Sequence, residues 1–100
     1  MVIEMNVIES VLLDEKHRNL RMQEQYKKEI EELPKGKLTL KKRKSGEYFY
    51  LVYREGRKVK YKYVGKDATD IEKQIEKRKH LEELLKKLKK EYKQIKKVVK

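Results

Sequence analysis

The chain has 100 residues, of which 37% are hydrophobic and 46% are charged, and its formal net charge is +12. This length corresponds to a single domain, residues 1–100, and so polar a composition excludes a large central core. The absence of cysteine excludes disulfides, thiolate metal ligands and a cysteine nucleophile, and it is typical of a reducing cytoplasm. No apolar run approaches the ~18 residues of a membrane span, and the apolar start lacks the basic region of a signal peptide. We therefore expect a cytoplasmic protein with no membrane partner.

The first segment, residues 1–33, has the periodicity of one long helix. Residues spaced alternately by three and four positions form a single coiled-coil seam along this helix, and the middle of the seam is polar. These residues are Met5, Ile8, Leu12, Lys16, Asn19, Gln23, Tyr26, Ile30 and Leu33. The segment "LPKG" ends the helix, because proline and glycine interrupt the helical backbone. Apolar side chains lie on more than one face of the opening "MVIEMNVIESVLL", so we expect either a second helix over them or a homodimer interface.

The middle segment, residues 37–64, changes to the alternation of β-strands and predicts a three-stranded antiparallel meander. The glycines of Ser45-Gly46 and Glu55-Gly56 favour two tight turns. With two-residue loops at these dipeptides, Tyr50 would lie opposite Tyr61.

The alternation divides the side chains of this meander between two faces. The first face would hold Thr39, Lys41, Arg43, Tyr48, Tyr50, Val52, Val59, Tyr61 and Tyr63. The second face would hold Leu38, Leu40, Lys42, Phe49, Leu51, Tyr53, Lys58, Lys60 and Lys62, with Val64 extending it. We expect the second face to rest on the helices, because its leucines and phenylalanine have no hydroxyl that needs a hydrogen-bond partner. A register slip of one residue would exchange the two faces.

The last segment, residues 68–99, predicts a second long helix. Its candidate caps or first-turn acids are Asp67, Thr69 and Asp70. Its seam is formed by Leu81, Leu85, Leu88, Tyr92, Ile95 and Val99, and it reaches back to Arg78 and Ile75 with one irregular step. Two helices with one apolar stripe each bury these stripes most simply against each other, and otherwise against another chain. We therefore predict an α+β fold, helix–meander–helix, with the helices paired as an antiparallel coiled-coil-like hairpin.

Side chains suited to catalysis are sparse. His17 and His80 stand alone in helical segments, and glutamate pairs are interleaved with lysines as on a solvated helix face. The chain has neither a glycine-rich phosphate loop nor a serine nucleophile elbow. We therefore expect a protein that is not an enzyme and that needs no cofactor and no metal ion.

Positive charge is concentrated in the meander. Residues 34–66 carry twelve basic and two acidic side chains, whereas residues 1–33 carry five basic and eight acidic ones. Such a field attracts the phosphates of DNA or RNA, an anionic lipid or an acidic protein surface. Basic side chains neutralise phosphates, and exposed tyrosines stack on unpaired bases. The candidate nucleic-acid-binding residues are Lys41, Lys42, Arg43, Lys44, Tyr48, Tyr50, Arg54, Arg57, Lys58, Lys60, Tyr61, Lys62 and Tyr63.

The stretch "LPKGKLTLKKRKSGEYFYLVYREGRKVKYKYVGKD", residues 33–67, resembles the hairpin signature of a family of short uncharacterised bacterial, archaeal and mobile-element proteins. Those proteins also place a helix rich in lysine and glutamate after the sheet, as residues 70–100 do here. Three strands followed by a helix are also similar to the arm-type DNA-binding module of phage and transposon integrases. That resemblance implies a sheet in the major groove, with contacts from Lys41, Arg43, Tyr48, Tyr50, Tyr61 and Arg54. The integrase catalytic domain has no counterpart here, and a long helix precedes the sheet.

The same strands also have a purely structural interpretation. Tyrosine favours strands, cross-strand tyrosine pairs stabilise sheets, and lysines on edge strands prevent edge-to-edge aggregation. Our leading hypothesis is a small basic nucleic-acid-binding accessory or regulatory protein, non-catalytic and of phage or mobile-element context. The alternative is a protein–protein interaction module, such as an anti-CRISPR-like inhibitor that binds an acidic surface of a host defence nuclease.

Overall fold

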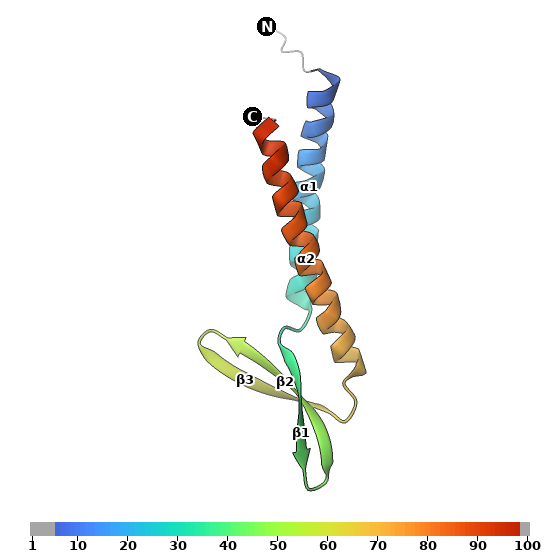
Figure 1. The fold of residues 1–100 in the computed structure, drawn as a ribbon, viewed down its shortest axis with the longest axis vertical. Helices are drawn as coiled ribbons and strands as arrows, with labels where there is room; N and C mark the ends of the chain where they lie inside the picture. The colour runs from blue at the N-terminus through green and yellow to red at the C-terminus, as the bar shows by residue number, and fades with distance from the viewer. Residues whose placement is uncertain (1–5, 99–100) are drawn as a thin grey trace. The chain divides into compact units, whose positions relative to one another are not determined.

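A computed structural model describes residues 6–98 of the protein. Its elements follow the order α1 (Val7–Glu32), β1 (Lys37–Arg43), β2 (Gly46–Glu55), β3 (Lys58–Gly65) and α2 (Thr69–Val98) (Figure 1). The predicted α+β fold, with a helix before and a helix after a three-stranded antiparallel sheet, is confirmed. The chain divides into two compact units, which we name the helical unit (residues 1–30 and 81–100) and the sheet unit (residues 31–80).

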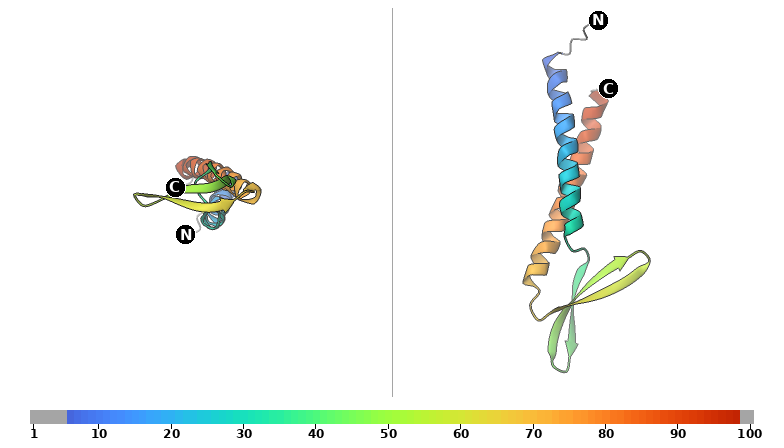
Figure 2. Two further views of the ribbon diagram at one scale, coloured as in Figure 1. Left: turned by 90° about the horizontal axis from the view of Figure 1, so that it is seen from below. Right: turned by 180° about the vertical axis from the view of Figure 1, so that it is seen from behind.

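In the helical unit, α1 and α2 lie side by side and run in opposite directions (Figure 1 and Figure 2). The side-chain amide of Asn19 in α1 donates a hydrogen bond of 2.9 Å to the backbone carbonyl of Leu88 in α2. Ile30 and Leu81 are buried, as the two seams predict. Each helix buries its apolar stripe against the other, which neither could do alone in water. The predicted antiparallel pairing is therefore confirmed.

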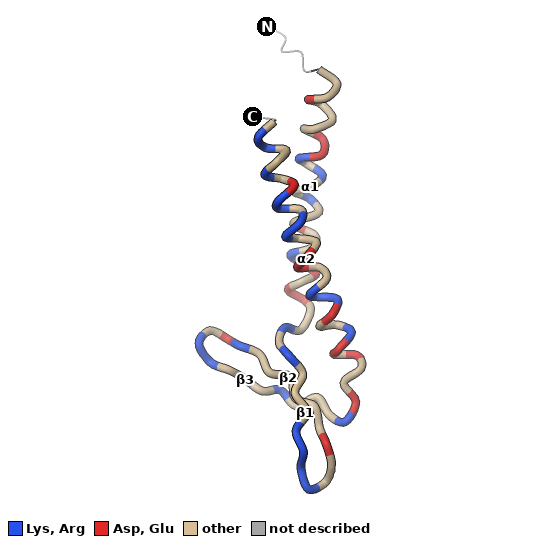
Figure 3. The backbone as a smooth tube through the Cα atoms, in the orientation of Figure 1, with Lys and Arg blue, Asp and Glu red and all other residues tan. Residues whose placement is uncertain are grey.

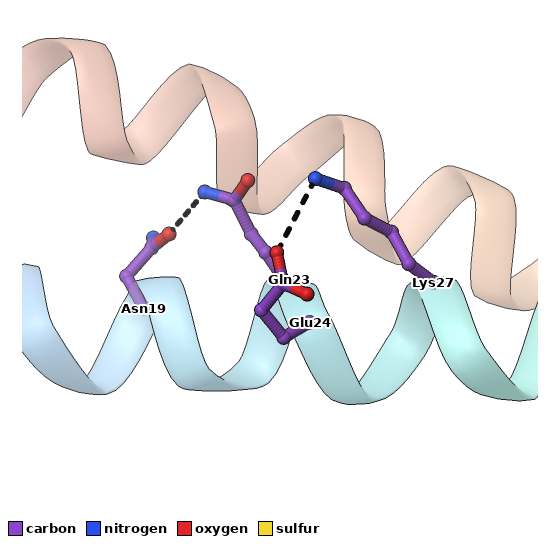
Figure 4. A network of polar contacts seen from close by, with 4 residues as sticks. All are labelled: Asn19, Gln23, Glu24 and Lys27. Atoms are coloured by element: carbon purple, nitrogen blue, oxygen red, sulfur yellow. Dashed lines mark hydrogen bonds and ion pairs between the residues drawn. The ribbon is translucent and has the colours of Figure 1, made fainter.

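Polar residues occupy the centre of this pairing. Asn19 and Gln23 are both buried, and Gln23 Nε2 donates a hydrogen bond of 2.7 Å to Asn19 Oδ1 (Figure 4). Glu24 and Lys27 form an ion pair of 3.7 Å on the neighbouring surface of α1. Within residues 6–98, every buried side-chain nitrogen or oxygen has a hydrogen-bond partner. Because a buried amide is costly wherever it lacks a partner, this polar layer favours one alignment of the two helices.

The predicted seam is wrong at the start of α1. Ile8 is 71% exposed and its neighbour Val7 is 80% exposed, whereas burial begins at the half-buried Leu12. Val98, the last described residue of α2, is itself exposed. Neither helix covers the other at this end, so α2 does not bury the apolar start of α1 over the described residues. Met5 and Val99, which the sequence pattern places in the seams, lie outside the described residues.

In the sheet unit, the strands pair in the order β1-β2-β3, and both pairs are antiparallel. The predicted register is wrong by two residues in each hairpin. Tyr50 lies opposite Thr39 and Tyr63, two positions away from each expected partner.

The position of the turns explains the difference in register. The two loops are residues 44–45 and 56–57, each one residue away from the predicted dipeptide. Gly56 takes the first central position of its loop with φ +62°, which is where a type II′ turn requires glycine. Gly46 follows the other loop and takes the fourth position of its turn, where type I turns favour glycine. A loop displaced by one residue shifts the pairing by two, so both faces keep their predicted residues.

The leucine face, as we name the predicted second face, is covered around Leu38 and Leu51, whereas Leu40 on the same face is 47% exposed. Leu51 is 5% exposed and lines one cavity together with Leu33, Val64 and Ile71. Leu38 lies across a second cavity from the buried Ile75. The segment after α1 and the first turns of α2 therefore cover this face within the sheet unit, as the sequence predicts.

Side chains form hydrogen bonds with backbone groups just after the end of α1 and at the start of α2. Arg78 donates a hydrogen bond of 2.7 Å to the carbonyl of Leu33, one residue beyond α1, where helix ends leave carbonyls unpaired. Asp67 accepts hydrogen bonds from the hydroxyl and the N–H of Thr69 at 2.6 and 3.0 Å, and these bonds lower the pKa of the Asp67 carboxyl. Asp67 is therefore a cap, as predicted. Across residues 6–98, no helix is both long enough and apolar enough to span a membrane.

Candidate functional site

The other face of the sheet combines tyrosine rings with basic side chains. We name it the tyrosine face, and its residues are Lys37, Thr39, Lys41, Arg43, Tyr48, Tyr50, Val52, Arg54, Val59, Tyr61 and Tyr63. Tyr61 and Tyr63 in β3 are 58% and 57% exposed, while Tyr48 and Tyr50 in the central strand are half-buried. This face therefore presents its aromatic side chains to solvent.

The tyrosine rings contact one another across the strands. Tyr63 lies edge-on to Tyr50, with ring centroids 5.5 Å apart, and tilted against Tyr48 at 6.0 Å. These contacts follow from the observed register, which sets Tyr63 opposite Tyr50. The Tyr48 hydroxyl donates a hydrogen bond of 2.9 Å to Ser45 Oγ in the first turn. The rings are thus held in defined orientations before any ligand binds.

Cations lie over three of these rings, and two of the cations come from β1. Lys41 Nζ is 4.4 Å from the ring centroid of Tyr61 and 5.1 Å from that of Tyr50. The guanidinium of Arg43 is 5.9 Å from the Tyr50 centroid and donates a hydrogen bond of 3.4 Å to the Tyr50 hydroxyl. Cation–π contacts at exposed sites are worth about 0.5–1 kcal/mol and leave the cation charged. The rings therefore position Lys41 and Arg43 without neutralising them.

Lys66 belongs to this cluster, although the sequence pattern did not indicate it. Its Nζ lies 5.7 Å from the ring centroid of Tyr48. The pattern ends the last strand at Val64, whereas a β-bulge makes Val64 an extra residue and extends β3 to Gly65. A glycine directly after an alternating run is the signal for such a bulge, and it could have placed Lys66 beside the sheet.

The structure divides the predicted binding residues among three places. The tyrosine face holds Lys41, Arg43, Tyr48, Tyr50, Arg54, Tyr61 and Tyr63. The leucine face holds Lys42, Lys58, Lys60 and Lys62, and the two loops hold Lys44 and Arg57. The aromatic candidates therefore all lie on one surface, together with three of the basic ones.

Carboxylates partly neutralise two of the four lysines of the leucine face, Lys42 and Lys60. Lys60 Nζ lies 2.7 Å from a carboxylate oxygen of Glu55, and Lys42 lies 3.7 Å from Glu47. The hydrogen bond between Lys60 and Glu55 and their mutual attraction raise the pKa of Lys60 and lower the pKa of Glu55. These lysines are consequently less available to an external anion.

The basic residues of the tyrosine face have no carboxylate partner. Lys41, Arg43 and Arg54 form no ion pair with any residue between 6 and 98. Within the same range, no group of three or more His, Cys, Asp or Glu is placed to hold a metal ion. The tyrosine face thus offers unneutralised cations and exposed rings, which are the groups that bind phosphates and stack on bases.

The fold and this surface define a small α+β protein whose sheet has one covered face and one basic, aromatic face. Residues 12–74 match the family described as "Domain of unknown function (DUF6788)". The match covers more than half of the chain, so the protein belongs to this family, whose description names no activity. No significant match was found among curated proteins or among solved structures.

Proposed function

We propose that the protein is a non-catalytic nucleic-acid-binding accessory protein of the cytoplasm and that it binds through the tyrosine face. One observation carries this proposal: exposed rings and unneutralised cations lie together on the uncovered side of the sheet, with Lys41 4.4 Å over Tyr61. Tyrosines that only stabilised the sheet could as well lie under the helix, but leucines take that position here. Exposed aromatic side chains that lie together on one surface are typical of a binding site.

Phosphate contacts would supply most of the affinity. Lys41 offers a point charge, while the forked guanidinium groups of Arg43 and Arg54 can each bind two phosphate oxygens. Each neutralised phosphate releases condensed counterions, so affinity falls with salt and carries no sequence information. A two-stranded ribbon is also narrow enough for the major groove of DNA, the position implied by the resemblance to the integrase arm module.

Stacking would add affinity for unpaired bases. Tyr61 and Tyr63 are the most exposed rings of the face, and they follow one another along the same side of β3. Base–aromatic stacking is worth about 1–3 kcal/mol per base and tolerates any sequence. The tyrosine face would therefore bind a single strand through rings and phosphates, and a duplex mainly through phosphates.

Binding measured by fluorescence anisotropy across salt concentrations tests the proposal on a generic duplex and a generic single strand. About five phosphate contacts made by the sheet should contribute about −4 to −5 to the log–log slope on the duplex. Replacing Lys41, Arg43, Arg54 and Arg57 by alanine should weaken binding to all sequences alike and flatten this slope. Absence of wild-type binding at ~50 mM salt, where phosphate contacts are strong, would contradict the proposal.

A second candidate function is self-association, which the exposed apolar start of α1 favours. Val7, Ile8 and Val11 are all more than half exposed, and such a patch is typical of an interface. We favour a second copy of the chain as the partner, because the same apolar patch on another copy could cover this one in a two-fold symmetric interface. Sedimentation should show a species heavier than a monomer, and V7K/I8K/V11K should restore the monomer. A monomeric wild type at high protein concentration would exclude this candidate.

A further inference from the structure

The later half of α2 carries a second basic surface, which lies in the helical unit. Its residues are Lys86, Lys89, Lys90, Lys93, Lys96 and Lys97, and all six side chains are exposed. With about 3.6 residues per turn, they fall within about one third of the helix circumference, outside the seam that packs on α1. Figure 3 shows this concentration of Lys and Arg on α2. We name this set the lysine stripe.

Neither the helix dipole nor ion pairing accounts for the whole stripe. Favourable interaction with the helix dipole is confined to the last turn, and only Lys96 and Lys97 lie in the last turn of α2. No lysine of the stripe forms an ion pair with a carboxylate among residues 6–98. The first half of α2 differs, because glutamates such as Glu72 and Glu76 alternate with its lysines.

The arrangement also opposes the stability of the helix. Lys93 lies four residues from both Lys89 and Lys97, and Lys86 lies four residues from Lys90. Like charges at this spacing repel each other and destabilise a helix. A bound polyanion would remove this repulsion, so ligand binding would offset the destabilisation that the stripe causes in the free protein.

The chemistry of the stripe selects the class of polyanion. A helix that binds a membrane surface inserts an apolar face between lipids, whereas the apolar face of α2 packs against α1. The lysine ammonium is a compact, strongly hydrated point charge without the planar fork of arginine. The sugar–phosphate backbone of a nucleic acid fits both observations. It needs no exposed apolar face on the helix, and its phosphates bind to positive charge without any further geometric requirement.

We infer that the lysine stripe is a second binding surface for the phosphate backbone of a nucleic acid, in addition to the tyrosine face. The inference rests on the proposed function, because that function names nucleic acid as the class of ligand. It differs in placing the contact in the helical unit and on other residues. Its affinity carries no preference for base sequence.

The test compares two variants that lose the same charge. K86Q/K90Q/K93Q/K97Q removes four lysines of the stripe, and K28Q/K73Q/K77Q/K79Q removes four exposed helical lysines outside it. With a generic duplex at low salt, the stripe variant should bind at least about tenfold more weakly, and its log–log salt slope should flatten by about 3.6 if all four contacts are lost. The control variant should stay within about threefold of wild type, because it loses only long-range attraction.

Thermal unfolding supplies a readout that does not depend on the binding assay. In low salt without ligand, the stripe variant should melt at a higher temperature than wild type, because lysine–lysine repulsion is gone. Added duplex should raise the melting temperature of wild type more than that of the stripe variant, since a ligand stabilises only the form that binds it.

The remaining outcomes contradict the role of the lysine stripe, the role of the tyrosine face, or both. Equal loss in the two variants would mean a net-charge effect and would overturn the inference. Loss of binding to phosphatidylserine vesicles, with duplex binding unchanged, would overturn it in favour of a membrane ligand. If the stripe variant bound as wild type does while K41A/R43A/R54A/R57A bound weakly, only the inference would be overturned. If the stripe variant bound weakly while K41A/R43A/R54A/R57A bound as wild type does, only the proposed binding through the tyrosine face would be overturned. Absence of any wild-type binding would overturn both.

Discussion

The two faces of the sheet contain aromatic and basic residues alike, yet they differ in what surrounds them. On the leucine face, Leu51 is buried and Lys60 is paired with Glu55. On the tyrosine face, Tyr61 is exposed and Lys41 lies over its ring without a carboxylate partner. Covering a tyrosine costs free energy unless its hydroxyl finds a partner, whereas covering a leucine does not. The face with apolar groups is therefore the buried one, and the basic, hydroxyl-bearing face stays exposed to solvent.

The largest effect is expected on the covered face. Leu51→Ala should lower the free energy of unfolding by about 2–5 kcal/mol, because it leaves a cavity in a small core. Its neighbour Val52 points to the tyrosine face, and Val52→Ala should cost about 1 kcal/mol or less. Urea unfolding followed by circular dichroism measures both. If the two substitutions lowered the free energy of unfolding equally, the difference in burial between the two faces would be disproved.

A smaller effect is expected where the chain enters β1. Gly36 has φ +117°, and an added Cβ would collide with the backbone carbonyl of Val52, so Gly36→Ala should cost at least about 2 kcal/mol. Gly46 has a similar φ of +131° but open space around it, so Gly46→Ala should cost only the backbone strain of about 1 kcal/mol. The difference in melting temperature between the two variants isolates the close approach to β2. Identical melting temperatures would mean that no such close approach exists.

Replacing exposed rings should affect binding more than folding. Y61L/Y63L should weaken binding to a single strand by about 1–3 kcal/mol per stacked base, while binding to a duplex changes little. Y61F/Y63F keeps the rings and should bind as wild type does. The free energy of unfolding should change by less than about 1 kcal/mol in both variants, because both rings are exposed. If the phenylalanine variant bound as weakly as the leucine variant, stacking would not be the contact.

The smallest effect concerns the exposed pair Lys60–Glu55. The lowered pKa of Glu55 means that its contribution to stability is present above the unfolded-state pKa and is lost as pH falls through the folded-state pKa. The raised pKa of Lys60 means that its contribution is present below its unfolded-state pKa and is lost as pH rises through the folded-state value. The contribution of this pair to stability should thus be present near neutral pH and should not change with pH there. Replacing Lys60 by methionine should return the Glu55 pKa toward its ordinary value, which carboxyl NMR can follow; an unchanged titration would disprove the pairing.

Periodicity in the sequence predicted the helices, the strands and the residues of each sheet face, because burial follows these periods. The register could not be predicted, because Gly56 fits more than one position of a tight turn and only its backbone conformation decides. Lys66 was missed because a bulge adds a residue to β3. The exposure of Ile8 was missed because periodicity identifies an apolar stripe but not how far a partner covers it. The partner of the buried Asn19 is a backbone carbonyl, which no side-chain pattern reveals.

The central claim is that the tyrosine face, and not the leucine face, contacts nucleic acid. Salt-dependent duplex binding of K41Q/R43Q and of K58Q/K62Q tests it most directly, because both variants remove two charges from the same sheet. The tyrosine-face variant should bind more weakly, with a slope flatter by about 1.8, and the leucine-face variant should stay close to wild type. Equal weakening, or a larger loss from K58Q/K62Q, would contradict the account.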